Sequence, residues 1–309
     1  MFDETQTDTK LKVVVDHEDL KPDTSGMTLL IDADTIAYAT CSACEYGDDE
    51  SGWYIDLPSA LIVAQDKIAT LIDLTGCKDA ELHFTSGKNF RHHLTSDYKS
   101  NRVSTRYPEG LREIKDLLQG TINTDYEADD IVCMLKREYP NKYIVCAVDK
   151  DVLNGVPGIH FNYYNSLKHN INMKWLEVSA SVTVYWPYMQ CLMGDSADGI
   201  SGVSRCGPSK VISLLCPTIV PQVKALQAKW KLDNGKAISS DKLITSIVIP
   251  NGLLDNLHTD ETIMWNTVKQ AYTDAGQEES EALLNMRLVH MHQLTKEKTL
   301  ELWCPPEEV

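Results

Sequence analysis

The spacing of apolar residues divides the chain into short strand-like runs and longer helix-like stretches. The helix-like stretches include residues 58–74 and 127–139. The runs that are too short for helices are 27–31, 81–84, 143–148 and 159–164. Strand-length runs that alternate with helix-length stretches are typical of an α/β fold. We therefore expect a mainly parallel central sheet flanked by helices.

The same pattern predicts three regions along the 309 residues. Residues 1–26 lack apolar periodicity apart from one short run and end in Pro-Asp-Thr-Ser-Gly, so we expect a flexible N-terminal extension. Residues 27–190 are predicted to form the α/β domain. In residues 191–309 the strand signals fade, which indicates a C-terminal region of helices and loops. It contains a Gly-rich turn at 199–207 and a predicted surface insertion at 217–256.

The polar and apolar pattern also bounds the class of protein. No apolar run approaches the ~20 residues of a membrane span, and the acidic N-terminus is unlike a signal peptide. Nine cysteines, an odd number, stand mostly inside apolar runs, as reduced buried thiols do. The CxxC formed by Cys41 and Cys44 lies in a predicted helix without a second pair, which favours core packing over metal binding. We expect a cytoplasmic protein with no membrane partner.

The net charge of −16 argues at first against nucleic acid, since Lys and Arg drive binding to the phosphate backbone. The charges are, however, unevenly distributed. The first 26 residues contribute −4, whereas residues 86–115 carry a net +4. We call residues 86–115 the basic segment; its basic residues are Lys88, Arg91, Lys99, Arg102, Arg106, Arg112 and Lys115.

Acidic residues recur where predicted strands end or helices begin. They are Asp32 and Asp34, Glu127, Asp129 and Asp130, Asp149 and Asp151, and Asp195 and Asp198. One such cluster is explained by the helix dipole. Several of them at the carboxyl ends of parallel strands would repel one another without a cation. Hard divalent cations prefer such oxygen ligands, and two ions about 4 Å apart suit in-line displacement at phosphorus. The pattern predicts a two-metal phosphodiesterase site.

A second enzyme class shares part of this pattern. Residues 29–35 fit the nucleophile strand of haloacid-dehalogenase-type phosphatases, an apolar run followed by DxDxT. In that interpretation Asp32 is a covalent nucleophile and Asp34 a general acid. It leaves the EADD sequence at 127–130, the basic segment and the glycine turn unexplained, so we keep it as a minor alternative.

Taken in order, the motifs resemble the 5′-nuclease superfamily, and phage-type 5′–3′ exonucleases most closely. Tyr98-Lys-Ser-Asn-Arg102 looks like its YKxNR signature, EADD is intact, and Asp149-Lys-Asp151 matches its DxD. Residues 194–203 resemble the lead into its helix-three-turn-helix. The matches span about residues 28–216, with a weaker similarity at Trp303. The resemblance implies a PIN-like or resolvase-like sheet, a helical arch around 86–115 and a helix-three-turn-helix.

The resemblance also implies roles for individual residues. Lys99 and Arg102 would be catalytic, contacting the scissile phosphate. Two Mg²⁺ ions, with Mn²⁺ as a substitute, would be held by Asp32, Glu127, Asp129, Asp130, Asp149, Asp151, Asp195 and Asp198. DNA would be contacted by Tyr98, Gly202, Gly207 and Lys210, with K⁺ bound in the glycine turn. The charge of the basic segment adds Lys88, Arg91 and Arg106 as expected DNA contacts. The implied partners are duplex DNA with 5′ ends, nicks, gaps or flaps, RNA–DNA hybrids and replication proteins, in a bacterial cytoplasm if the gene is phage-encoded.

Three departures from the family pattern bear on these expectations. Ser86 stands where an aspartate is usual after the second strand, Arg205 replaces a glycine of the DNA-binding turn, and Asp34 is shared with only some members. We predict a metal-dependent 5′–3′ exodeoxyribonuclease with flap-cutting and RNA-primer-removing activity. The alternative is a DNA-binding protein of the same fold that has weak or no cleavage activity.

Overall fold

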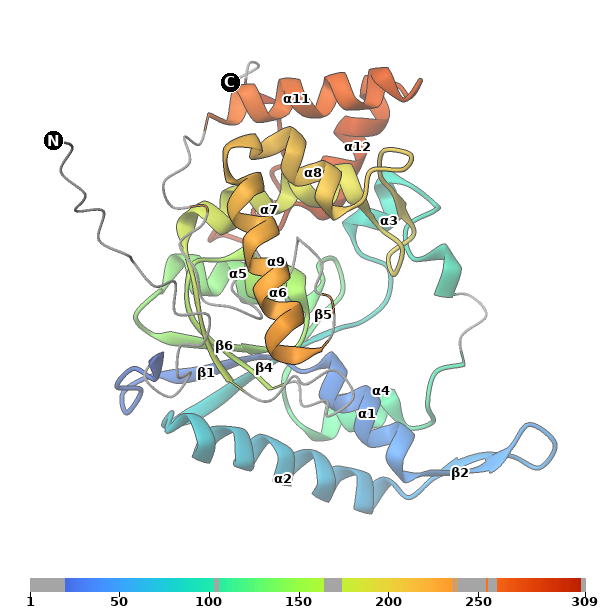
Figure 1. The fold of residues 1–309 in the computed structure, drawn as a ribbon. Helices are drawn as coiled ribbons and strands as arrows, with labels where there is room; N and C mark the ends of the chain where they lie inside the picture. Colours follow the sequence, from blue (N-terminus) through green and yellow to red (C-terminus); the bar gives the residue numbers. More distant parts are fainter. Residues whose placement is uncertain are drawn as a thin grey trace, which may run out of the picture.

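The computed structural model describes residues 20–102, 106–163, 174–235, 237, 254 and 260–306 (Figure 1). Two sequence predictions fall partly outside this set. Residues 1–19 of the predicted extension and residues 236, 238–253, 255 and 256 of the predicted insertion lie outside the described residues. The end of the extension is described and contacts the domain, because the Thr24 hydroxyl donates to the Thr75 carbonyl over 2.6 Å and Leu20 packs against the core.

A six-stranded sheet forms the centre of the molecule, with strand order β5-β4-β1-β6-β7-β8. Neighbouring strands run parallel except for the last pair, β7 and β8. The strands are β1 (Thr28–Asp32), β4 (Asp79–Thr85), β5 (Thr121–Asn123), β6 (Tyr143–Ala147), β7 (Gly158–Asn162) and β8 (Lys174–Val178). The predicted α/β fold with a mainly parallel sheet is confirmed.

The central strand β1 is fully buried because helices cover both faces of the sheet (Figure 1). Leu29 and Ile31 point to one face and pack in a core with α1, α2 and α4. Leu30 points to the other face and packs with residues of α5 and α6. Complete burial of such a side chain contributes about 1.5–3 kcal/mol. These helices are α1 (Asp34–Cys44), α2 (Leu57–Thr75), α4 (Leu111–Leu117), α5 (Ala128–Glu138) and α6 (Lys150–Gly155).

Helix caps position several of the acidic residues. Glu127 is the N-cap of α5 and forms a reciprocal capping box with Asp130. Asp149 is the N-cap of α6 and accepts a hydrogen bond from the Asp151 amide over 2.8 Å. Because α5 and α6 begin at the edge where β1 and β6 end, capping brings Asp149 and the first turn of α5 close to Asp32 at the carboxyl edge of the sheet.

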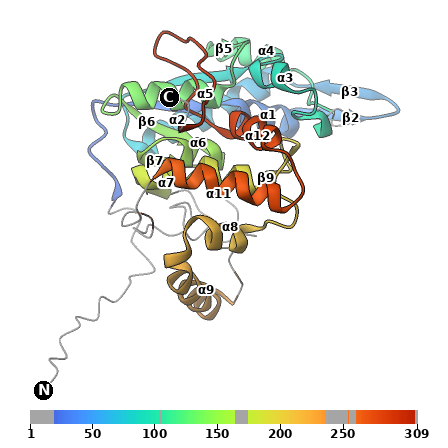
Figure 2. The ribbon, with the colours of Figure 1, turned by 90° about the horizontal axis from the view of Figure 1, so that it is seen from above.

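The C-terminal helices lie above the sheet in Figure 1 and are seen from above in Figure 2. Their buried side chains form a second hydrophobic core. Trp265 and Tyr272 are completely buried in it. Trp303 lies at its margin with its ring centroid 4.9 Å from that of Trp265. The helices are α7 (Ala180–Met193), α8 (Pro208–Leu215), α9 (Val220–Asn234), α11 (Glu261–Asp274) and α12 (Glu279–Val289), with the short η4 (Pro217–Ile219) between α8 and α9.

The basic segment links β4 to β5. It contains α3 (Phe90–Leu94), the short η2 (Ser100–Arg102) and α4. Residues 103–105 lie outside the described set. An antiparallel hairpin of β2 (Glu45–Asp48) and β3 (Gly52–Ile55) projects beside it (Figure 1). The described parts therefore place short helices, rather than one long helix, over the carboxyl edge of the sheet.

The cysteines and the helices agree with two further expectations from the sequence. All nine cysteines are free thiols, and seven of them, Cys41 included, are buried. Cys41 and Cys44 lie in α1, as predicted. Among the described helices no single one is long and apolar enough to cross a membrane, and only the sharply bent pair Pro208–Leu215 and Pro217–Leu232 reaches the required length and composition when its halves are combined.

Candidate active site

Three carboxylates converge at the carboxyl edge of the sheet from three separate elements. Asp32 ends β1, Asp149 follows β6, and Asp129 lies in the first turn of α5. Burial first, and then the charges of Asp34 and Asp149, raise the pKa of Asp32 to about 7. Burial, Asp32 and Asp149 together raise the pKa of Asp129 as well. We call Asp32, Asp129 and Asp149 the central carboxylates.

The central carboxylates have no basic partner within the described part of the chain. None of the ion pairs there includes Asp32, Asp129 or Asp149. Their hard oxygen donors fit a divalent cation such as Mg²⁺, which would relieve their mutual repulsion. Among the described residues no three acidic, His or Cys side chains are already arranged as a metal-binding group. Binding of an ion would therefore draw these carboxylates closer together.

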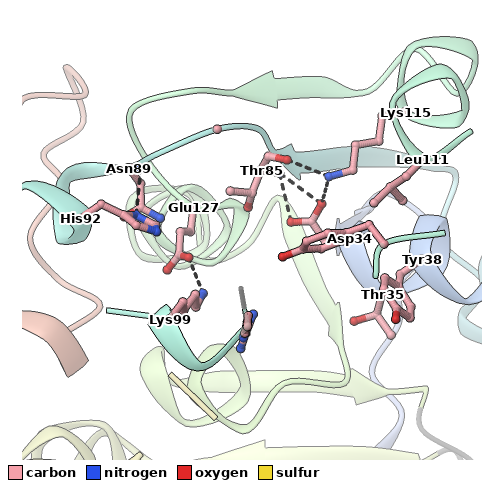
Figure 3. A pocket seen from close by; sticks show the side chains of 13 residues that line it. Asp34, Thr35, Tyr38, Thr85, Asn89, His92, Lys99, Leu111, Lys115 and Glu127 are labelled. Carbon is pink, nitrogen blue, oxygen red and sulfur yellow. Dashed lines mark hydrogen bonds and ion pairs between the residues drawn. The ribbon is translucent and has the colours of Figure 1, made fainter. Parts of the chain in front are cut away.

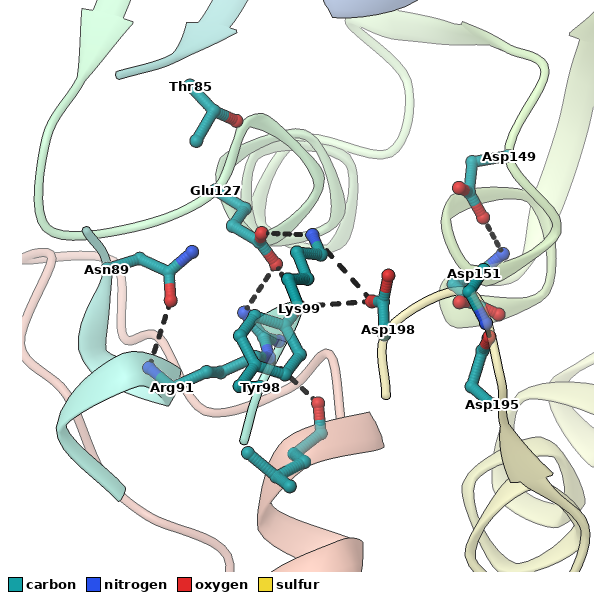
Figure 4. A network of polar contacts seen from close by, with 12 residues as sticks. Thr85, Asn89, Arg91, Tyr98, Lys99, Glu127, Asp149, Asp151, Asp195 and Asp198 are labelled. Atoms are coloured by element: carbon teal, nitrogen blue, oxygen red, sulfur yellow. Dashed lines mark hydrogen bonds and ion pairs between the residues drawn. The ribbon is translucent and has the colours of Figure 1, made fainter. Parts of the chain in front are cut away.

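Asp151 and Asp195, which were expected to hold metal and are labelled in Figure 4, are instead bridged by a lysine. The Lys150 ammonium lies 2.7 Å from Asp195 Oδ2 and 3.1 Å from each oxygen of Asp151. Two side chains of α7 also donate to Asp151 Oδ1, Gln190 over 2.6 Å and Trp186 over 3.3 Å. This half of the predicted metal site is thus neutralised by groups of the protein itself.

Glu127 is also held by protein groups. Its Oε1 atom accepts from the Lys99 ammonium, and its Oε2 atom accepts from the Tyr98 hydroxyl over 2.8 Å (Figure 4). After the penalty of burial, Lys99 and then Arg91 dominate and lower the pKa of Glu127 to about 2. Glu127 is therefore an anion at neutral pH, and a metal ion that took it as a ligand would compete with Lys99.

The predictions for Arg91 and Asp130 are wrong. Arg91 was expected to contact DNA, but its side chain is completely buried. Its guanidinium binds both oxygens of Asp130 over 2.7 Å each, and its Nε donates to the Leu288 carbonyl of α12 over 2.8 Å. Asp130 was expected to hold metal, but its carboxylate is occupied by this bidentate pair. The pair joins α3, α5 and α12 and has a structural role.

Tyr98 does not have the role predicted for it either. The side chain was expected to contact DNA, but the residue is only 3% exposed. Its hydroxyl donates to Glu127 over 2.8 Å and lies 3.1 Å from Asp198. Burial against the C-terminal core leaves neither ring face open for a base. Tyr98 instead links the basic segment to two acidic residues of the site.

Lys99 and Arg102 fix the basic segment to the loop between β9 (Gly194–Asp195) and β10 (Ile200–Ser201). Arg102 binds Asp198 over 2.6 Å, and the Lys99 amide donates to the Asp198 carbonyl over 2.8 Å. Lys99 also adopts a left-handed backbone with φ of 54°, which is uncommon for a non-glycine residue. The structure brings both predicted catalytic cations to the acidic cluster, where Asp198 is their ion-pair partner rather than a free ligand.

A cavity of about 690 Å³ opens between the basic segment and the sheet edge (Figure 3). Its lining combines the acidic Asp34 and Glu127 with the basic Lys99, Arg102 and Lys115, and further includes Thr35, Tyr38, Thr85, Gly87, Asn89, His92, Tyr107 and Leu111. Polar groups of both signs beside the central carboxylates suit a substrate that carries a phosphate and an ion.

Lys115 is the partner of Asp34, one of the residues at which the sequence departs from the family pattern. Its ammonium lies 2.6 Å from Asp34 and 2.7 Å from the Thr85 carbonyl. Asp34 also accepts from the Thr85 amide over 3.0 Å, so it fixes the loop that follows β4. Ser86, where an acid is usual, lies in that loop and donates its amide to the Asn123 carbonyl. Asp34 therefore supports the wall of the cavity and has a cationic partner, unlike Asp32.

The predicted DNA-binding turn joins α7 to α8. A Cβ atom on Gly202 would lie 2.3 Å from the Gly194 amide nitrogen, so only glycine fits there. Gly207 and Lys210 are exposed at the start of α8, and nothing lies within 4 Å of a Cβ placed on Gly207. Arg205 adopts the left-handed φ of 57° that a glycine would favour. The turn thus leaves its backbone open at Gly207 and accommodates the arginine.

The two remaining basic candidates differ in their surroundings. Lys88 is exposed in the loop after β4. Arg106 pairs with Glu45 over 2.6 Å, and its guanidinium lies 4.0 Å from the ring centroid of Trp53 in the β2–β3 hairpin. Lys88 has no such fixed partner among the described residues, whereas Arg106 connects the basic segment to the hairpin.

Sequence reasoning missed three side chains that shape the site. Gln190 and Trp186 hold Asp151, and Lys115 holds Asp34. Gln190 and Trp186 lie one helical turn apart on α7. This spacing is the only sign in the sequence that they act together, and the same spacing is found in side chains that only pack in a core. Lys115 was counted in the basic segment, but its distance from Asp34 along the chain conceals the contact.

Comparison with known proteins supports the resemblance inferred from the motifs. No protein-family model matches the chain. A curated relative, an exodeoxyribonuclease of Enterobacteria phage T3, is 23% identical over 299 residues, which are 90% of this chain and 92% of the relative. The chain is thus similar to a phage exodeoxyribonuclease along nearly its whole length, in agreement with the resemblance to phage-type exonucleases.

Several solved structures are similar to the chain at low sequence identity. The T5 D15 protein co-crystallised with metal ions has a TM-score of 0.48 and 14% identity, over 86% of this chain and 89% of that one. The catalytic core of Rad2 in complex with DNA substrate has a TM-score of 0.44 and 14% identity, over 89% and 95%. Flap endonuclease-1 from Methanococcus jannaschii has a TM-score of 0.44 and 13% identity, over 90% and 95%.

Proposed function

We propose that the chain is a divalent-metal-dependent nuclease that cleaves DNA from 5′ ends. One observation carries the proposal: three carboxylates from three elements meet without a basic partner, beside a cavity lined by Lys99 and Arg102. Burying Asp32, which is 5% exposed, beside two other carboxylates is costly unless a cation joins them. The relative named an exodeoxyribonuclease supports the choice of nucleic acid as substrate.

Asp32, Asp129 and Asp149 would hold the ion, for which Mg²⁺ is the natural choice and Mn²⁺ a substitute. The bound ion would supply Lewis-acid chemistry at the scissile phosphodiester. Lys99 lies at the cavity wall with its ammonium beside Glu127, from where it can reach a phosphate oxygen. Arg102 has a side chain that is 43% exposed and can turn from Asp198 toward the same phosphate. Both cations would stabilise negative charge that develops in the transition state.

Duplex DNA would be held at the turn that contains Gly202 and Gly207. The exposed start of α8 is a helix N-terminus, which favours a phosphate, and Lys210 adds a positive charge. Contacts of this kind recognise the backbone rather than base sequence. Lys88 would extend the same positively charged surface. Carbonyls of the turn would coordinate K⁺.

The finer assignment is a 5′–3′ exonuclease that also cuts 5′ flaps and removes RNA primers. Its substrates would be blunt ends, nicks, gaps, flaps and RNA–DNA hybrids, and its partners other replication proteins. Action in the cytoplasm of a bacterial host would follow from the similarity to a phage protein. Residues 27–190 would form the nuclease domain and residues 191–309 the DNA-binding region, with the basic segment as the arch.

A 5′-labelled duplex incubated with and without Mg²⁺ tests the proposal. We expect short labelled products with Mg²⁺ and none in EDTA, and comparison of blunt, gapped and flapped substrates would give the preferred end. Binding of DNA without any Mg²⁺-dependent product would overturn the nuclease assignment in favour of a DNA-binding protein. Release of phosphate from a small phosphoester, with DNA left intact, would indicate a haloacid-dehalogenase-type phosphatase.

A further inference from the structure

Lys150 is a basic residue that lies between acidic residues of the site. It is the first residue of α6 and stands between two aspartates that the sequence assigned to metal. Its ammonium lies within 3.1 Å of three carboxylate oxygens, two from Asp151 and one from Asp195. A lysine ammonium is charged at neutral pH, and here it directly contacts both carboxylates. A monovalent cation of the protein therefore lies between the two carboxylates.

The other donors around Asp151 and Asp195 complete their coordination. Asp151 Oδ1 accepts from Gln190 over 2.6 Å and from Trp186 over 3.3 Å, and both donors lie on the rigid helix α7. Asp195 Oδ1 accepts from the Ala197 amide over 2.9 Å. All four oxygens of the two aspartates thus have hydrogen-bond donors. A metal ion would have to replace the Lys150 contacts before it could bind this pair.

The central carboxylates present the opposite situation. Asp32, Asp129 and Asp149 form no ion pair within the described ranges, and their mutual repulsion favours any cation that enters. Two carboxylates with one ammonium carry a net charge of −1, whereas the three central carboxylates carry −3 when ionised. Affinity of a hard cation rises with the number of charged ligands. The central carboxylates should therefore bind a divalent ion much more tightly than Asp151 and Asp195 do.

We propose that Lys150 acts as a built-in cation in the half of the site formed by Asp151 and Asp195. The free protein then binds one divalent ion tightly, at the central carboxylates, and a second ion only weakly. The side chain of Lys150 is 46% exposed, so it can swing into solvent when a second ion displaces it. Lys150 is thus a positioning residue that sets the order of metal loading. This inference rests on the proposed metal-dependent function.

Titration of the DNA-free protein with Mn²⁺, followed by electron paramagnetic resonance, counts the ions and their affinities. Wild type should bind one Mn²⁺ tightly and a second at least about tenfold more weakly, because the ammonium opposes the second ion. Lys150→Met should strengthen the second site about tenfold, and Lys150→Arg should retain the weak second site. Lys142→Met is the matched control, since Lys142 contacts Tyr143 at the other end of β6 and should change neither affinity.

Thermal unfolding provides a second measurement that also reports whether Lys150→Met folds. In EDTA this variant should melt below wild type, because Asp151 and Asp195 lose their cation, and Mn²⁺ should raise its melting temperature more than that of wild type. Two equal Mn²⁺ sites in wild type, or an unchanged second site in Lys150→Met, would overturn the inference while leaving Mg²⁺-dependent cleavage intact. Absence of any Mn²⁺ binding would overturn it together with the proposed function.

Discussion

Two adjacent aspartates of α5 have opposite environments. Asp130 is 2% exposed and receives two hydrogen bonds of 2.7 Å from Arg91, which is itself completely buried. Asp129 faces Asp32 and Asp149 and has no ion-pair partner among the described residues. Successive residues of a helix point about 100° apart, so neighbours in sequence face different parts of the molecule. One carboxylate stabilises the fold, and the other has no ion-pair partner among the described residues.

The contrast extends to the groups around each aspartate. The Arg91 network, which we define as Arg91, Asp130, Glu127 and Leu288, joins α3, α5 and α12 through hydrogen bonds that satisfy each charge. At the central carboxylates, burial and mutual repulsion instead raise the pKa of Asp32 and of Asp129. A satisfied buried network rigidifies its surroundings, whereas an unsatisfied one costs stability. The rigid network holds α5 in place, whereas the neighbouring central carboxylates have no basic partner among the described residues.

The largest expected effect separates the two aspartates by function. Asp129→Asn should lower Mg²⁺-dependent cleavage by about 10³- to 10⁴-fold, which corresponds to the several kcal/mol that a bound metal supplies. DNA binding should remain or improve, because one negative charge that repels phosphate is removed. Single-turnover cleavage and DNA affinity measure the two effects. Equal loss of both in this variant would show that Asp129 has no metal role.

The second prediction tests the Arg91 network. Arg91→Met should destabilise the protein by ~3–5 kcal/mol, because Asp130 would be left buried without its partner. Chemical denaturation measures the change. Arg106→Met is the matched control, since its pair with Glu45 lies at the surface, and it should leave the free energy of unfolding within error. A similar small change in both variants would mean that the Asp130 charge is balanced in another way.

The contrast also shows which features could be predicted from the sequence. The run that forms β1 predicted a buried parallel strand, and its end placed Asp32 at the carboxyl edge correctly, because period and strand polarity are local properties. The direction in which Asp130 points, and its pairing with Arg91 39 residues away, depend on tertiary packing. Composition likewise marked Arg91 as a DNA contact, because charge counting takes no account of burial. The gathering of carboxylates at this edge of the sheet was thus predictable, but the partners of each carboxylate were not.

A third prediction uses the pH dependence of stability in EDTA. The pKa of Asp32 is raised to about 7, whereas an aspartate in the unfolded chain titrates near ~3.9. Between these values the folded state binds a proton that the unfolded state has released, so the contribution of Asp32 to stability falls as pH rises and is constant above about pH 7. As the pH rises through this window, Asp32→Asn should therefore become progressively more stable relative to wild type.

The measurement is the free energy of unfolding of both proteins at pH values within the window and above it. The difference between the variant and wild type cancels the histidines, whose pKa values are lowered by burial and which act in the opposite direction. Mg²⁺ should abolish the difference in slope by stabilising the ionised carboxylate of the wild type. A difference that does not change with pH would place Asp32 in a solvated environment.

The smallest expected effect concerns DNA contacts away from the carboxylates. Lys210 is exposed at the start of α8 beside Gly207, so Lys210→Ala should weaken DNA binding several-fold and reduce the slope of log affinity against log salt by about 1. Cleavage at saturating DNA should be unchanged, because Lys210 does not line the cavity. Lys142→Ala, at the opposite edge of the sheet, is the control and should leave the slope as it is. An unchanged slope in Lys210→Ala would place the DNA elsewhere, and the glycine turn would then be only a connection between α7 and α8.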